Sequence, residues 1–201
     1  MKNAVLTGIG VIALVVGGWF FLTQNSATTT QNQEIVRVTT PSAPQRLTLA
    51  STDFPAGGSI PSKFTCDGLE EAPRLSVAGI PEATKSLVLI MDDPDIPDFY
   101  KKKNGVNAFD HWILFNISPE TTEISETTEG IAGPNGLGRN EYMGPCPPRE
   151  FEPADHAYSF RLYALDTLLS LGEGATKQEI EKAMEGHIIV ETKVIGRYKR
   201  P

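Results

Sequence analysis

Runs of apolar residues along the chain predict a protein built mainly from β-strands. Residues 87–91 (LVLIM) are continuously apolar, which is typical of a strand covered on both faces. Residues 111–117 (HWILFNI) and 158–165 (YSFRLYAL) alternate with the period of two that strands produce, so His111 and Ile113 are expected on one face. Shorter strands are expected at residues 46–54, 60–66, 74–77 and 187–195.

One late helix interrupts this pattern. Thr176 followed by Glu179 forms a capping box. The next residues place an apolar stripe at helical spacing, made of Ile180, Ala183 and Met184. These signals predict a helix from about 177 to 185. Many strands with one short helix favour a mostly β fold with largely antiparallel sheets.

Three carboxylates follow the continuous apolar run. Pro94 lies between the pair Asp92–Asp93 and Asp95, and Pro97 follows. Because proline cannot donate to a sheet ladder, the strand should end here. In extended backbone, Asp93 and Asp95 project to one side and Asp92 to the other. This geometry suits a binding site at a strand end. The alternative, that the aspartates only satisfy turn amides, stays open.

Two histidines and a loop rich in glycine and proline complete the candidate chemistry. His111 begins one predicted strand and His156 precedes another, so with carboxylates they could act as acid and base, although each alone also fits a structural role. Residues 118–157 are largely irregular, and their glycines allow backbone amides to approach an anion. Residues 98–105 carry three lysines and are expected to form a loop.

Composition and charge narrow the possible functions. The 201 residues suit one domain after an N-terminal segment, and the formal charge of −7 argues against nucleic acid as a partner. Two cysteines and three histidines lack zinc-type spacing, so no metal site is expected. The motifs of serine hydrolases, P-loop proteins and zinc proteases are absent from the sequence. We therefore assign no cofactor and no catalytic residue.

The N-terminal residues predict a membrane anchor. Residues 4–22 are 19 positions without a charge, and at ~1.5 Å per residue they could span a bilayer core. Lys2 precedes them, which predicts a transmembrane signal-anchor at residues 1–22 with the folded domain outside the cytoplasm; secretion after cleavage is the alternative. Residues 23–45 are polar and predict a flexible linker, and residues 46–201 the folded domain.

The two cysteines allow two interpretations. Cys146 lies between prolines and could be a reactive thiol, whereas an exported protein with two cysteines more often pairs them. A bridge between Cys66 and Cys146 would stabilise the fold by about 4 kcal/mol in the loop-entropy model.

Six segments in the same order resemble the phosphatidylethanolamine-binding protein family, also called Raf kinase inhibitor proteins, and in particular its bacterial and archaeal branch. The resemblance covers roughly residues 47–200. The segments are FTCDG at 64–68, SLVLIMDDPDIP at 86–97, HWILFNI at 111–117, GPNGLGRNEYMGPCPP at 133–148, HAYSFRLYALD at 156–166 and GATKQEIEKAMEGHI at 174–188.

This resemblance implies a β-sandwich with a short helix and a small pocket at one end, which takes up phosphate, phosphorylated head groups or carboxylates. In this sequence, Ala157 replaces an arginine that is usual in the family motif, which bears on ligand affinity more than on fold. An aspartate would orient a histidine and raise its pKa, so that an imidazolium faces the anion. The implied ligand-binding residues are Asp93, Asp95, Pro97, His111, Gly144, Pro145, His156 and Tyr158.

The leading hypothesis is therefore a membrane-tethered binding module for small anions or phosphorylated head groups, with a regulatory or inhibitory role toward an unknown protein partner. One alternative is a hydrolase that uses His111 or His156 with Asp93 as acid and base. Another is a protein inhibitor of a protease that acts through surface loops. An exported domain argues against a cytoplasmic kinase as the target.

Overall fold

The computed structural model describes residues 46–201. The anchor expected at residues 1–22 and the linker expected at residues 23–45 lie outside these residues. Within residues 46–201, no helix has the length and apolar character needed to cross a membrane.

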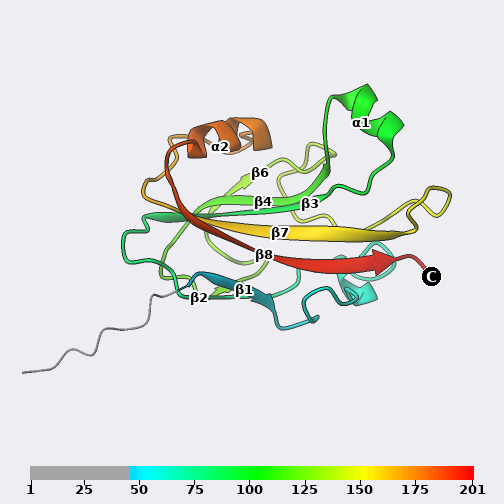
Figure 1. Cartoon of the computed structure of the whole chain (residues 1–201), viewed down its shortest axis with the longest axis horizontal. Helices are drawn as coiled ribbons and strands as arrows, with labels where there is room; N and C mark the ends of the chain where they lie inside the picture. The colour runs from blue at the N-terminus through cyan, green and yellow to red at the C-terminus, as the bar shows by residue number, and fades with distance from the viewer. Residues whose placement is uncertain (1–45) are drawn as a thin grey trace, which may run out of the picture. The chain divides into compact units, whose positions relative to one another are not determined.

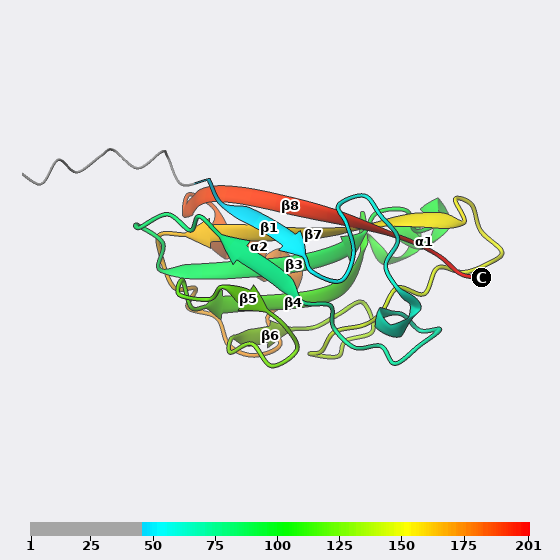
Figure 2. The same cartoon turned by 90° about the horizontal axis from the view of Figure 1, so that it is seen from below.

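Two antiparallel sheets face each other and confirm the expected β-sandwich (Figures 1 and 2). The larger sheet has the order β6 (Ile131–Gly133), β4 (Phe109–Ile117), β3 (Ser86–Asp93), β7 (Asp155–Leu165) and β8 (Ile188–Lys199). The smaller sheet has the order β1 (Thr48–Ser51), β2 (Leu75–Ala78) and β5 (Glu123–Ile124).

The strand β3 lies at the centre of the larger sheet and is buried along its whole length. Leu87, Leu89 and Met91 pack into the core between the sheets. Val88 and Ile90 pack into a second core on the opposite face, beneath α2 (Lys177–Met184). The continuous apolar run therefore has the cause expected from the sequence, because both faces of the strand are covered.

The predicted late helix is confirmed as α2, which covers one face of the larger sheet in Figure 1. Its capping box is formed, with the Thr176 side chain accepting from the Glu179 amide and the Glu179 side chain accepting from the Thr176 amide. The buried residues Ile180 and Met184 hold the helix against the sheet.

Three local expectations were wrong. Residues 98–105 contain a helix, α1 (Asp98–Asn104), which ends at Gly105 with φ of 67°. This helix has no buried residue, so the apolar period that would have indicated it is absent. Residues 60–66 form the 3-10 helix η1 (Ser62–Phe64) and a turn in place of a strand. The last strand continues beyond residue 195 to Lys199.

A β-bulge also changes the face expected for His111. Met91 pairs with Trp112 and Asp92 pairs with Asp110, so His111 is an extra residue on β4. The His111 ring packs against Tyr158, which lies with Trp112 in the core between the sheets, whereas Ile113 lies in the core on the opposite face. Sequence alternation alone could not have shown this.

A disulfide joins Cys66 to Cys146. It links the turn after η1 to the proline-rich loop that precedes β7, so the pairing interpretation of the two cysteines is confirmed and the free-thiol interpretation is wrong.

Candidate ligand-binding cavity

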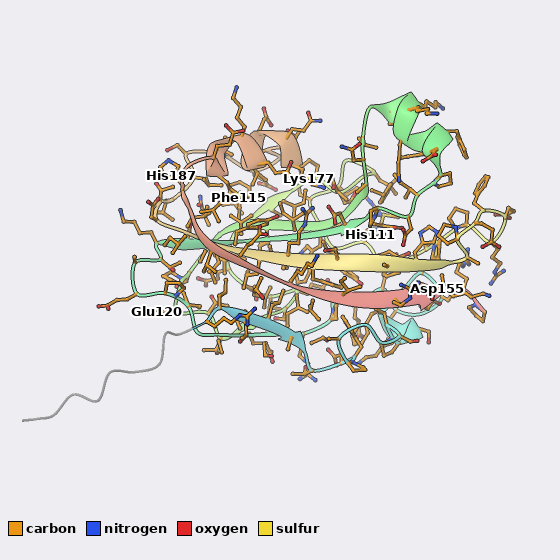
Figure 3. All side chains as sticks on the ribbon, viewed as in Figure 1. His111, Phe115, Glu120, Asp155, Lys177 and His187 are labelled. Atoms are coloured by element: carbon orange, nitrogen blue, oxygen red, sulfur yellow. A yellow bond between two sulfur atoms is a disulfide. The ribbon has the colours of Figure 1, made fainter. Side chains whose placement is uncertain are left out.

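A cavity of about 260 Å³ lies where β3 ends and where β4 and β7 begin. Since these strands are antiparallel neighbours, those three points meet at one end of the sandwich. Figure 3 labels His111 and Asp155 toward this end. Most of the cavity wall is apolar, and the residues in it with polar side-chain atoms are Asp93, Tyr100, His111, His156 and Tyr158.

A buried histidine and aspartate form the base of the cavity. His156 Nδ1 lies 2.7 Å from Asp93 Oδ2, and both residues are almost fully buried. The second oxygen of Asp93 accepts the Asp95 amide at 2.8 Å. Burial alone favours the neutral imidazole, but the hydrogen bond to Asp93 and its charge raise the pKa of His156 above 6.5. The aspartate therefore favours a cationic ring.

Two polar atoms of the cavity residues His156 and Tyr158 have no hydrogen-bond partner among residues 46–201. These atoms, His156 Nε2 and Tyr158 Oη, are both buried. Burial, followed by the charge of Asp93, raises the pKa of Tyr158, so its hydroxyl keeps its proton. Because unpartnered buried polar groups are costly, these two donors suit an acceptor bound in the cavity.

His111 has the opposite electrostatic character. Burial lowers the pKa of His111, and the Met143 carbonyl and nearby aspartates offset this only in part. Its Nδ1 lies 2.8 Å from the Met143 oxygen. Since a carbonyl only accepts, Nδ1 carries the proton and Nε2 of the neutral ring is an acceptor. The cavity thus combines His156, whose raised pKa favours the protonated donor form, with His111, whose lowered pKa favours a neutral ring with Nε2 as an acceptor.

Aromatic rings hold these groups in position. The His111 ring packs edge-on against Tyr158 and also contacts Phe109, each at a centroid distance of 5.1 Å. The His156 ring stacks on Tyr158 at 6.3 Å. Such packing limits rotation of both imidazoles, so their nitrogens keep fixed directions.

The structure brings five of the eight residues implied by the resemblance together around the cavity, namely Asp93, Pro97, His111, His156 and Tyr158. The other three do not line it and instead support the loops around it. Asp95 Oδ2 accepts the Ala157 amide at 2.8 Å, and the Pro145 carbonyl accepts the Cys66 amide at 3.2 Å. A Cβ at Gly144 would lie 2.8 Å from the Phe64 carbonyl oxygen, so this position requires glycine for close packing.

Several lining residues, most of them apolar, were not identified from the sequence: Ile96, Tyr100, Phe109, Leu137, Met143, Pro147 and Pro148. Phe109 comes from the first residue of β4. Tyr100 comes from α1, a helix that the sequence did not predict. Their proximity to the histidines is set by the folded chain. The only sequence signal for Phe109 is its position two residues before His111.

A β-sandwich with a small, mostly apolar cavity and a few polar groups at one end is consistent with a small-ligand binding module. A sequence model described as phosphatidylethanolamine-binding protein matches residues 50–199. This match covers most of the chain, and the chain belongs to the phosphatidylethanolamine-binding protein family.

Individual relatives agree with this assignment. A protein named UPF0098 protein from Methanothermobacter thermautotrophicus is 42% identical over 162 residues, which cover 77% of this chain and 99% of the relative. The crystal structure of a putative phosphatidylethanolamine-binding protein homologue from Chlamydia trachomatis has 37% identity and a TM-score of 0.71, and the match covers 78% of this chain and 99% of that chain. Escherichia coli YbcL shares the fold at 22% identity, with a TM-score of 0.67 over 77% of this chain and 99% of its own.

Proposed function

We propose that the cavity binds a small anionic group, such as phosphate, a phosphorylated head group or a carboxylate. The observation that carries this proposal is the buried His156–Asp93 pair, in which His156 Nε2 has no hydrogen-bond partner among residues 46–201. The Tyr158 hydroxyl is also without a partner among these residues, and both residues line the cavity. An anion there would accept from both donors. A ligand hydroxyl or ammonium would donate to His111 Nε2.

The same proposal includes membrane tethering through residues 1–22, with the folded domain outside the cytoplasm and a regulatory or inhibitory role toward a protein partner. The apolar N-terminal segment and the pairing of both cysteines support this location, because disulfides persist in oxidising compartments. Alkaline extraction of membranes tests it. An anchored chain stays with the membrane pellet, whereas recovery in the supernatant would contradict the tether.

Binding is tested by thermal unfolding of the full chain with phosphate, phosphoethanolamine or acetate. A ligand at 100 times its dissociation constant adds about 2.7 kcal/mol to the free energy of unfolding and raises the midpoint. His156→Gln removes the cation and should abolish the shift. His187→Gln is a matched control, because His187 pairs with Asp166 on the surface. A midpoint that no anion raises would contradict the anion site and favour inhibition through surface loops.

Anion affinity should also fall as pH rises, because the raised pKa of His156 sets when the ring loses its charge. Below this pKa the imidazolium is present and affinity is constant. Above it, affinity should fall by up to about tenfold per pH unit, since binding requires one proton. Calorimetric titration with acetate, whose own charge is constant from neutral to alkaline pH, checks this. An acetate affinity that does not change with pH in wild type would be inconsistent with the proposed role of His156. The same pH dependence in His156→Gln would also be inconsistent with it.

The opposite characters of the two histidines support a second candidate function. The raised pKa of His156 suits a proton donor and the lowered pKa of His111 suits a proton acceptor, the two groups that hydrolysis by acid and base catalysis requires. Release of phosphate or alcohol from phosphomonoesters and carboxylic esters tests it. Turnover that disappears in His111→Ala while anion binding persists would favour the hydrolase, and saturable binding without turnover would favour the binding module.

A further inference from the structure

A second and larger cavity, of about 680 Å³, lies at the opposite face of the five-stranded sheet. Its lining comes from β3, β4, β7 and β8, from the N-terminal part of α2, and from loops that include residues 105–108 before β4 and residues 134–135 after β6. Lys177, labelled in Figure 3 at the start of α2, is one of its lining residues. This volume is within the range that holds small polar ligands.

Strand alternation separates this cavity from the histidine cavity. On β3, Asp92 lines the larger cavity and Asp93 the smaller one. On β7, Ser159 and Arg161 line the larger cavity and Tyr158 the smaller one. The two cavities share no lining residue, so a ligand in one does not occupy the other.

An ion network occupies one side of the larger cavity. Asp92 Oδ2 accepts from Arg161 Nη2 and from Lys177 Nζ, the latter at 2.7 Å. Lys177 Nζ also donates to Asp110 Oδ1 at 2.9 Å. Two cations therefore neutralise two carboxylates. This network explains how the buried Asp92 is tolerated, but it leaves other lining groups unpaired.

The unpaired groups are two donors and one carboxylate. Arg161 Nε is buried without a hydrogen-bond partner among residues 46–201. Lys193 is exposed and forms no ion pair within the described part of the chain. Glu181 also lines the cavity and forms no ion pair within those residues.

Arg161 and Lys193 are direct cross-strand partners of β7 and β8. Directly opposite residues share a face with Cβ atoms roughly 5 Å apart, and two like charges in such a pair repel each other. Asp92 already offsets the charge of Arg161, whereas Lys193 has no ion-pair partner among the described residues. An oxyanion that accepts from both side chains would balance the charge of Lys193 and would give Arg161 Nε its missing acceptor.

We propose that this cavity binds a small polar ligand by placing a carboxylate or phosphate group between Arg161 and Lys193. Glu181 disfavours a bare anion and favours a ligand that also carries an ammonium or hydroxyl group. The site is independent of the histidine cavity.

NMR titration of the full chain tests the proposal, with the Arg161 Nε–H signal as a direct reporter. The probes are inorganic phosphate, acetate, glycine and phosphoserine. Phosphate and acetate separate the two oxyanion classes, and glycine differs from acetate by the ammonium group that Glu181 would attract. We expect a saturable shift of the Arg161 Nε–H signal with at least one probe, and tighter binding of glycine than of acetate if carboxylate is the preferred oxyanion.

Three variants test whether the probe binds at this cavity and not elsewhere on the protein. Lys193→Ala should weaken binding about tenfold, as expected for loss of one charged contact. Lys182→Ala removes an exposed α2 lysine that does not line the cavity and should have no effect. His156→Gln should also leave the titration unchanged, whatever it does to the proposed anion cavity. Shifts that do not saturate, that persist at full strength in Lys193→Ala, or that disappear in His156→Gln would overturn the proposal.

Discussion

Replacing Asp93 with alanine is expected to destabilise the protein by about 2–3 kcal/mol, because it removes a buried hydrogen bond between a carboxylate and His156. His156 would lose the hydrogen bond and the charge that offset its burial, so its pKa should fall. At neutral pH the ring would then be uncharged, and anion binding should be lost together with stability. Urea unfolding and NMR titration of the His156 ring measure the two effects.

Asp95→Ala is the matched control. Asp95 belongs to the same turn, but it is only partly buried and accepts one backbone amide, that of Ala157. Its loss should cost about 1 kcal/mol and leave the pKa of His156 raised. Equal costs for the two variants, or an unchanged His156 titration in Asp93→Ala, would show that Asp93 does not control the ring.

Removing the disulfide with the double substitution Cys66→Ser and Cys146→Ser is expected to cost about 4 kcal/mol. The two cysteines are 80 residues apart, and opening so long a loop increases the entropy of the unfolded chain. Anion affinity should fall too, since Cys146 and the two prolines that follow it line the cavity. Unfolding in denaturant and anion titration measure both losses.

A reducing agent supplies the control for this prediction. Wild type under reducing conditions should match the double variant, while the double variant itself should not respond to the reductant. A wild type that loses its bridge without change in stability or affinity would show that the loop is held by its other contacts, such as the hydrogen bond between the Cys66 amide and the Pro145 carbonyl.

Elements with a strong local pattern could be predicted from the sequence. The central strand was predicted from an apolar run that ends at Met91, and α2 from its capping box and apolar stripe. The opposite projection of Asp92 and Asp93 followed from strand alternation, and the two residues do line different cavities. In each case a short stretch of chain contains both the signal and its cause.

Other features could not be predicted in this way, because they leave no pattern in the local sequence or depend on contacts between distant residues. The helix α1 has no buried face and therefore no apolar period. The turn of His111 toward the cavity depends on a bulge, which is defined only by the register between β3 and β4. The resemblance named the aspartates and histidines as a set, but the pairing of Asp93 with His156, 63 residues apart, follows from the folded chain.

The sequence by itself determined the mostly β fold, the central strand, the late helix and the residue types available for binding. Tertiary structure decided which of those residues meet, which atoms stay unpartnered and which charges face each other across strands. The physical reason is that local periodicity sets which face a side chain occupies, whereas burial, protonation and hydrogen bonding depend on neighbours supplied by remote segments of the chain.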